Sequence, residues 1–149
     1  MKVMGMHHDS VVDGEGLRTV IFFAGCPHHC FGCHNPESWN PKNGKEMSVQ
    51  EIMDEVLSNP LTDITFSGGE PFCQAKEVKE LARELKKLNK NIWIYTGYTI
   101  EQLKSSEDKH VGELLEYCDV LVDGPFIIEK RDITLPFRGS SNQRIIKLK

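Results

Sequence analysis

The sequence predicts an α/β fold, in the form of an open partial (β/α) barrel with mostly parallel strands. Short apolar runs alternate along the chain with amphipathic helical stretches, which is the pattern of parallel strands joined by right-handed crossovers. The length of 149 residues is too short for a closed eightfold barrel, which needs at least about 200. A doubly wound sheet is the other arrangement that this alternation allows. Residues 1–149 are expected to form a single domain.

Each element follows from a local pattern. Strands are expected where apolar and β-branched residues cluster, at residues 19–23, 63–67, 91–96, 119–123 and 144–148. Helices are expected where apolar residues recur every three or four positions, at residues 48–57, 75–88 and, with a break near 105–108, 99–118. Ser48 and Glu51 form a capping-box pattern, and Pro60 stops the first helix. The first dozen residues carry little signal.

Composition and charge exclude several classes of function. The chain is 39% hydrophobic and 27% charged, which is ordinary for a soluble protein. Its net charge of −4 and the lack of a basic stripe argue against nucleic-acid binding. No apolar run approaches the ~20 residues of a membrane span, and the N-terminal residues do not resemble a secretory signal. We therefore expect a cytoplasmic protein that binds neither nucleic acid nor a membrane.

Three of the five cysteines, Cys26, Cys30 and Cys33, lie in a C-x3-C-x2-C loop directly after the first predicted strand. Clustered cysteines in a reducing compartment indicate metal ligands rather than disulfides. Three thiolates can hold three irons of a four-iron cluster and leave the fourth iron open. The alternative is a zinc site, in which a nearby histidine supplies the fourth ligand. The absence of a second C-x2-C pair favours the cluster.

The histidines near the cysteine loop and the two isolated cysteines are expected to have structural roles. His28, His29 and His34 are interpreted as residues that shape the loop or are exposed. Cys118 follows apolar residues at helical spacing and is expected in the core. Cys73 is also expected to pack, with a labile thiol near the site as the lesser alternative.

Four loops are expected to meet at one edge of the sheet. The cysteine loop and residues 67–71, 96–99 and 123–126 each follow a predicted strand, and parallel α/β folds build their sites at the carboxyl ends of strands. Gly68 and Gly69 would let the backbone approach a ligand closely, although alone they indicate only a tight turn. The polar segments 13–16 and 139–143 are interpreted as surface loops.

These motifs together resemble the radical S-adenosylmethionine (SAM) superfamily. The cysteine loop and Gly68-Gly69-Glu70-Pro71 carry that resemblance, and residues 13–19, DGEGLRT, are similar to activases of glycyl-radical enzymes. Within this group, segments 35–39, 93–98, 122–126 and 138–143 are similar to the activating proteins of anaerobic ribonucleoside-triphosphate reductases. The resemblance runs from about residue 13 to the end of the chain.

The resemblance implies a set of cofactors and contacts. Cys26, Cys30 and Cys33 would hold a [4Fe-4S] cluster whose fourth iron binds SAM. The residues implied to border the SAM molecule are Gly32, Cys33 and His34, with Gly68, Gly69 and Glu70 at its amino end and Thr96 and Gly97 near its ribose or methionine part. On this basis we expect alanine at Gly69 to keep the cluster and weaken SAM binding.

The resemblance also implies a reaction and partners. The expected activity is that of an oxidoreductase that cleaves SAM reductively and generates a glycyl radical on the reductase. The glycine-bearing C-terminal loop of the reductase would enter through the open side of the barrel, with residues 123–141 as candidates for docking. A low-potential donor such as a flavodoxin would supply the electron. The alternatives are an activase of another glycyl-radical enzyme, of the formate-lyase type, and a non-catalytic zinc-binding adaptor.

Overall fold

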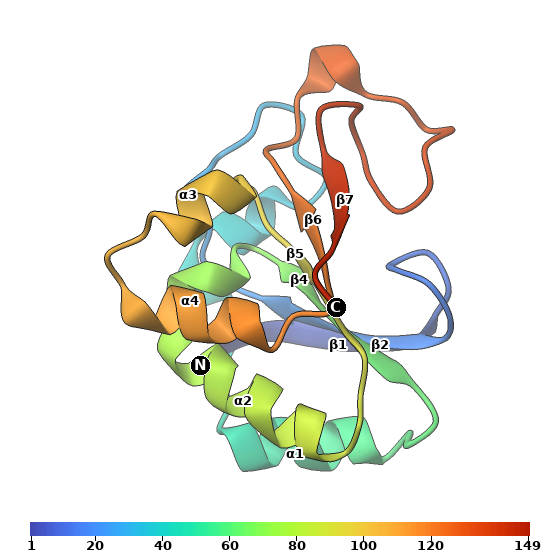
Figure 1. Ribbon diagram of the computed structural model, residues 1–149, viewed down its shortest axis with the longest axis vertical. Coiled ribbons are helices and arrows are strands. Elements are labelled where there is room, and N and C mark those ends of the chain that lie inside the picture. The colour runs from blue at the N-terminus through green and yellow to red at the C-terminus, as the bar shows by residue number, and fades with distance from the viewer.

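The computed structural model describes all 149 residues and contains one seven-stranded sheet in the order β3-β1-β2-β4-β5-β6-β7. The strands are β1 (Lys2–Ser10), β2 (Arg18–Phe23), β3 (Lys45–Glu46), β4 (Asp63–Gly68), β5 (Ile92–Tyr95), β6 (Val120–Asp123) and β7 (Arg144–Lys147). The helices are α1 (Val49–Leu57), α2 (Ala75–Lys87), α3 (Ile100–Lys104) and α4 (Lys109–Glu116). Figure 1 shows the helices gathered on one side of the twisted sheet.

The middle of the sheet is parallel. Strand β2 pairs with β4, β4 with β5, and β5 with β6, all in parallel, and α1, α2 and the α3–α4 pair lie in the three connections. In this register Phe23, at the end of β2, lies beside Gly68, at the end of β4. The predicted α/β alternation is therefore confirmed for this part of the chain, and the carboxyl ends of these strands lie at one edge.

The outer strands differ from the prediction. Strand β1 was not predicted, and it pairs antiparallel with both β2 and β3. Strand β7 lies where a last strand was expected, but it runs antiparallel to β6 because the segment between them contains no α-helix to carry the chain back across the sheet. The expectation of mostly parallel strands holds only for the four central strands.

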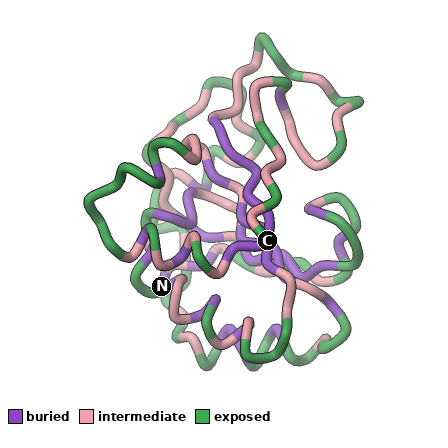
Figure 2. The backbone as a smooth tube through the Cα atoms, viewed as in Figure 1, coloured by how far each residue is buried: buried purple, intermediate pink, exposed green.

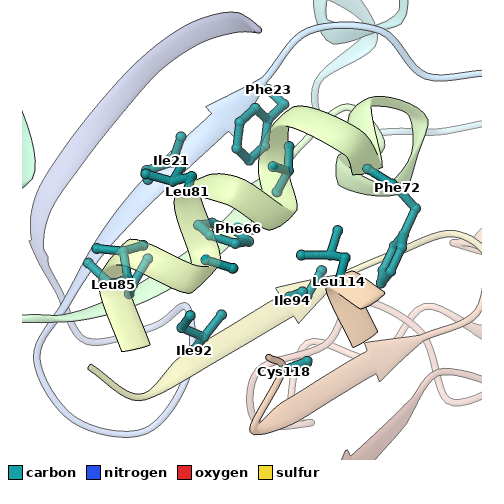
Figure 3. Close-up of a cluster of buried hydrophobic side chains, with 14 of the residues drawn as sticks. Ile21, Phe23, Phe66, Phe72, Leu81, Leu85, Ile92, Ile94, Leu114 and Cys118 are labelled. Atoms are coloured by element: carbon teal, nitrogen blue, oxygen red, sulfur yellow. The ribbon is translucent and has the colours of Figure 1, made fainter. Parts of the chain in front are cut away.

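The main core lies between the sheet and the helices. Strand residues alternate between the two faces of the sheet, so Ile21, Phe66 and Ile94 point to the side on which α2 lies (Figure 3). The helix contributes Leu81 and Leu85 to the same buried cluster. The buried stretches of the central strands run through the middle of the molecule in Figure 2. Cys118 also lies in this cluster and is fully buried, which confirms its predicted packing role.

The opposite face of the sheet carries a smaller apolar cluster. Trp93, Val120 and Val122 form it, and the partly buried Phe137 packs against them from the segment before β7. The β1–β2 loop and the segment before β7 project on this side, away from α1 and α2 (Figure 1). One face of the sheet is therefore covered by helices and the other is bordered by loops.

Arg18 is the first residue of β2, and its side chain is buried against Trp93 of the second apolar cluster. Its side chain is 1% exposed, and its guanidinium donates hydrogen bonds to the carbonyl oxygens of Glu15, Ile64 and Asn91 and to the hydroxyl of Thr65. The guanidinium carbon lies 5.6 Å from the centre of the Trp93 ring. Burial lowers the pKa of this guanidinium. The loop at residues 13–16 is exposed at Glu15 and Gly16, as expected, but Gly14 is buried and packs against the Arg18 side chain.

Gly14 is required by that arrangement. Its φ is +126°, and a Cβ at this position would lie 2.9 Å from Arg18 Cδ and 2.9 Å from the Trp93 ring. A side chain at this position would meet strain and steric overlap together. Gly14, the first glycine of the DGEGLRT segment, thus leaves room for the side chain of Arg18 in the same segment.

Replacing Ser48 with alanine tests the predicted start of α1. The Ser48 hydroxyl accepts a hydrogen bond from the Glu51 amide, and the Glu51 carboxylate accepts one from the Ser48 amide. Because this capping box is present, Ser48→Ala is expected to lower the free energy of unfolding by ~1 kcal/mol in urea denaturation. Ser141→Ala, at an exposed serine whose hydroxyl makes no hydrogen bond, is the matched control and should leave stability unchanged.

None of the helices combines the length and the apolar character needed to cross a lipid bilayer.

Candidate iron–sulfur site

The loops at the carboxyl ends of β2, β4, β5 and β6 line one cleft. The residues that line it are Cys26, His28, Cys30, Ser67, Gly68, Gly69, Tyr95, Thr96, Gly97, Gly124, Phe126 and Gln143. The structure therefore brings two of the three cysteines together with both glycines of the β4 turn and with Thr96 and Gly97, as the strand order predicts.

The cysteine loop is anchored at its start. The Gly25 amide donates to the Ser38 carbonyl at 2.6 Å, and the Cys26 amide donates to the Trp39 carbonyl at 3.2 Å. The Glu70 amide donates to the Gly25 carbonyl at 2.8 Å, so the turn after β4 is joined directly to this loop. The two motifs are thus parts of one hydrogen-bonded unit.

Gly68 and Gly69 allow this close approach. Gly68 has φ +95°, and a Cβ on it would lie 2.4 Å from the amide nitrogen of Phe23. A Cβ on Gly69 would lie 2.5 Å from the carbonyl oxygen of Gly25. Both glycines are therefore needed because the chain packs against its own backbone at this point.

This packing changes the result expected for Gly69→Ala. The added methyl group would press on the start of the cysteine loop, so we now expect the variant to lose bound iron and folding stability, rather than to weaken SAM binding alone. Iron content and urea denaturation measure the two effects. Gly112→Ala is the control, because a Cβ at this helical glycine meets nothing within 4 Å and alanine favours a helix. A Gly69→Ala protein with wild-type iron content would contradict the expectation.

The outer part of the loop faces the segment after β6. Gly32 has φ +80°, and a Cβ on it would lie 2.7 Å from Ile128 Cδ1. The exposed ring of His34 lies 5.2 Å from that of Phe126. Gly32, Cys33 and His34 do not line the cleft itself.

Glu70 lies beneath the cleft and does not line it. Its side chain is 0% exposed. The carboxylate accepts hydrogen bonds from the hydroxyl of Thr96 and the amide of Gly97, and it lies 2.7 Å from the Nε2 atom of His28. Glu70 therefore lies at the site as predicted, but its carboxylate oxygens accept hydrogen bonds from other residues of the chain.

The donor set fits an iron–sulfur cluster by its chemistry. Three thiols on one eight-residue segment suit thiolate ligation of iron, and the free Cys26 and Cys30 open into the cleft. No three His, Cys, Asp or Glu side chains gather around one position for a single metal ion. Burial raises the pKa of the Cys26 thiol, and backbone hydrogen bonds from His28 and His29 oppose this shift.

Comparisons with known proteins agree with this site. A family model described as a 4Fe-4S single cluster domain matches residues 12–146. The chain is 35% identical to the anaerobic ribonucleoside-triphosphate reductase-activating protein of Haemophilus influenzae, over 100% of this chain and 99% of the relative. It is 39% identical to the protein of that name from Vibrio cholerae, over 91% of this chain and 90% of the relative.

The chain belongs to the family of anaerobic ribonucleoside-triphosphate reductase-activating proteins. The relative from enterobacteria phage T4 is 35% identical over 90% of this chain and 86% of its own length. The resemblance identified from the sequence motifs is thereby confirmed at the level of the family.

In this member of the activating-protein family, Cys73 does not pack as predicted. The residue is exposed and follows the buried Phe72, in the 3-10 turn at Pro71–Gln74. Partial desolvation of its sulfur raises the pKa of the thiol to about 11, so it carries little thiolate at neutral pH. The labile-thiol alternative therefore has no electrostatic support.

Several residues at the site of this activating-protein chain were missed by sequence reasoning. The cleft is also lined by Tyr95, Gly124, Phe126 and Gln143. The sequence had indicated only the segments that contain them, and not these residues themselves. Their shared position after neighbouring strands was the signal that could have found Gly124 and Phe126. Gln143 was interpreted as part of a surface loop, but its side-chain amide donates to the Gly124 carbonyl and so brings it to the cleft.

Proposed function

We propose that this protein is the radical-generating activase of an anaerobic ribonucleoside-triphosphate reductase. The observation that carries the proposal is the shared cleft, in which a C-x3-C-x2-C loop meets the glycine turn of β4 in a chain of the activating-protein family. When bound and reduced, a [4Fe-4S] cluster would supply the one-electron reduction that cleaves SAM to methionine and a 5′-deoxyadenosyl group, and so the oxidising equivalent for a glycyl radical on the reductase. The chain's own residues bind and orient these groups.

The residues proposed to hold the cofactors follow from their positions. Cys26, Cys30 and Cys33 would hold a [4Fe-4S] cluster through three of its irons, which would leave the fourth iron available to SAM. The β4 turn, at Gly68 and Gly69, and the β5 loop, at Thr96 and Gly97, line the same cleft as Cys26 and Cys30 and would border SAM there. Gly32, Cys33 and His34 do not line the cleft, so their proposed contact with SAM rests on the family resemblance alone.

The fold is proposed to be a partial barrel of the radical SAM type, with the loop-bordered face as its open side. Support comes from large apolar side chains that are exposed on the loops of that face: Val12 is 71% exposed and Ile133 is 85% exposed. In the segment before β7, the Nε atom of Arg138 and the Oδ1 atom of Asn142 are buried without a hydrogen-bond partner. These groups make residues 123–141 and their neighbours the proposed docking region for the glycine-bearing loop of the reductase.

A low-potential protein such as a flavodoxin is the proposed electron donor. Cys26 borders the cleft on one side and a second surface pocket on the other, which is lined by Lys2, Trp39 and Pro41. A ligand of the cluster therefore lies close to the outer surface, where a donor can approach it without entering the SAM cleft.

The proposed chemistry is tested by SAM cleavage in the absence of the reductase. Anaerobically reconstituted protein should contain about four irons and four sulfides per chain, and with dithionite and SAM it should release methionine and 5′-deoxyadenosine in equal amounts. A colourless protein with one zinc and no SAM cleavage would support the adaptor alternative and refute the proposal.

A further inference from the structure

The carboxylate of Glu70 joins the loops that follow three different strands. It accepts hydrogen bonds from the Phe72 amide at 3.1 Å, the Gly97 amide at 2.8 Å and the Thr96 hydroxyl at 2.8 Å, and it lies 2.7 Å from His28 Nε2. His28 follows β2, Phe72 follows β4, and Thr96 and Gly97 follow β5. A buried carboxylate is costly unless its oxygens are satisfied, and here all of its partners belong to the chain itself.

His28 fits a position shaped for its ring. A Cβ on Gly97 would lie 2.4 Å from the Cδ2 atom of His28, so the glycine makes room for the imidazole. The Tyr98 ring meets the imidazole edge to face, with centroids 4.5 Å apart and an interplanar angle of 74°. His28 is also the one basic side chain within ion-pairing distance of Glu70. The ring is therefore held by a hydrogen bond and by packing on two sides.

Few other contacts hold this part of the cysteine loop. Residues 27–32 make no backbone hydrogen bond to any residue outside the loop. Their side-chain anchors are the His28–Glu70 hydrogen bond on the cleft side and the stacking of His29 on Trp39, with centroids 4.5 Å apart, on the outer side. Because His28 lies two residues from both Cys26 and Cys30, its anchor fixes the segment that carries both thiols.

We propose that Glu70 and His28 form a latch, in which the buried Glu70 carboxylate holds the His28 ring and thereby positions Cys26 and Cys30 for the cluster. The inference rests on the proposed function and changes the role expected for Glu70 from a contact with SAM to a positioning residue. Two observations separate these roles: the carboxylate is 0% exposed, and it does not line the cleft that its neighbours Gly69 and Gly97 line.

The test compares Glu70→Gln, His28→Phe and the double variant. Phenylalanine keeps a ring against Gly97 and Tyr98 but loses Nε2, and glutamine keeps the size of Glu70 but places an amide among hydrogen-bond donors. After anaerobic reconstitution, the rate at which a chelator removes iron is measured for each. We expect each single variant to lose iron on the order of tenfold faster than the wild type. The double variant should be no faster than the faster of the two single variants, because both changes break the His28–Glu70 hydrogen bond.

Three further variants complete the test. His28→Gln places a side-chain amide that can still donate to Glu70, so it should restore slow iron loss. This rescue also tests the latch if Glu70→Gln fails to fold. The matched controls are Glu107→Gln and His7→Phe. Both residues are exposed and their side chains make no hydrogen bond or ion pair, so these variants should lose iron at the wild-type rate.

Other outcomes would overturn the latch. Wild-type iron loss in His28→Phe, together with a raised KM for SAM in Glu70→Gln, would show that Glu70 contacts the cofactor directly. Multiplication of the two single effects in the double variant would show that the residues act independently. A wild-type protein that holds no four-iron cluster or does not cleave SAM would instead refute the proposed function, so the two failures are distinguishable.

Discussion

Replacing Cys30 with alanine is expected to abolish both the cluster and SAM cleavage. The substitution leaves two thiols in the loop, and the neighbouring histidines are engaged elsewhere, since His28 bonds to Glu70 and His29 stacks on Trp39. The remaining nearby histidine, His34, lies against the Phe126 ring, outside the cleft. Iron should fall from about four atoms per chain to less than about one, and methionine should not form from SAM. Iron and sulfide analysis and chromatography of the products measure the two effects.

Cys73→Ser is the matched control for this prediction. Cys73 is exposed and lies outside the cysteine loop, so its replacement should leave a full cluster and wild-type SAM cleavage. Loss of iron in Cys73→Ser, or retention of a full cluster in Cys30→Ala, would mean that the wrong thiols have been assigned to the metal.

Replacing Arg18 with methionine is expected to cause the largest loss of stability. Methionine retains most of the apolar length of the side chain but removes the guanidinium donor from the Ile64 carbonyl, the Thr65 hydroxyl and the Asn91 side-chain oxygen. Each buried polar group left without a partner costs ~1–3 kcal/mol. Together with the lost contact to Trp93, the free energy of unfolding should fall by about 3–5 kcal/mol. Urea denaturation of the cluster-free protein measures this change.

Arg83→Met provides the comparison for Arg18. Arg83 lies on α2, is about half exposed, and its guanidinium pairs only with Glu80, one turn away. Exposed pairs of this kind contribute little, so the unfolding free energy should change by less than ~0.5 kcal/mol. Equal effects of the two substitutions would show that the buried arginine does not clamp the edge of the sheet.

The central strands and their helices were predictable because each carries its own pattern. The buried strands at Ile64 and Ile92 contain apolar and β-branched residues, and α2 shows apolar residues at helical spacing. The capping box that begins at Ser48 is local in sequence and was confirmed, and the structure contains a second one at Thr99. Such signals do not depend on which strand lies beside which.

The outer strands were less predictable because tertiary pairing defines them. Strand β1 contains a glycine and two histidines and shows no sustained apolar run, yet it pairs along β2. The direction of β7 depends on the connection that precedes it, which has no helical pattern. Neither feature is visible in a short sequence window.

The site also contains some features that the sequence predicted and others that it could not. Residue type and spacing identified the cysteines, and the order of strands and loops indicated that Gly68 and Gly69 would lie near them. The partners of Glu70 could not be predicted, because His28 and Thr96 are far from it in sequence and meet it only after folding. A glutamate beside a glycine pair suggests a ligand contact until its burial is known.

Electron paramagnetic resonance of the reductase after activation tests the central claim most directly. The reconstituted protein is mixed anaerobically with SAM, a low-potential reductant and the anaerobic ribonucleoside-triphosphate reductase, and the spectrum is recorded with and without SAM. The proposed function predicts a glycyl-radical signal that requires SAM and is absent with Cys30→Ala. A wild-type protein that carries its cluster and cleaves SAM, yet produces no radical on the reductase, would contradict it.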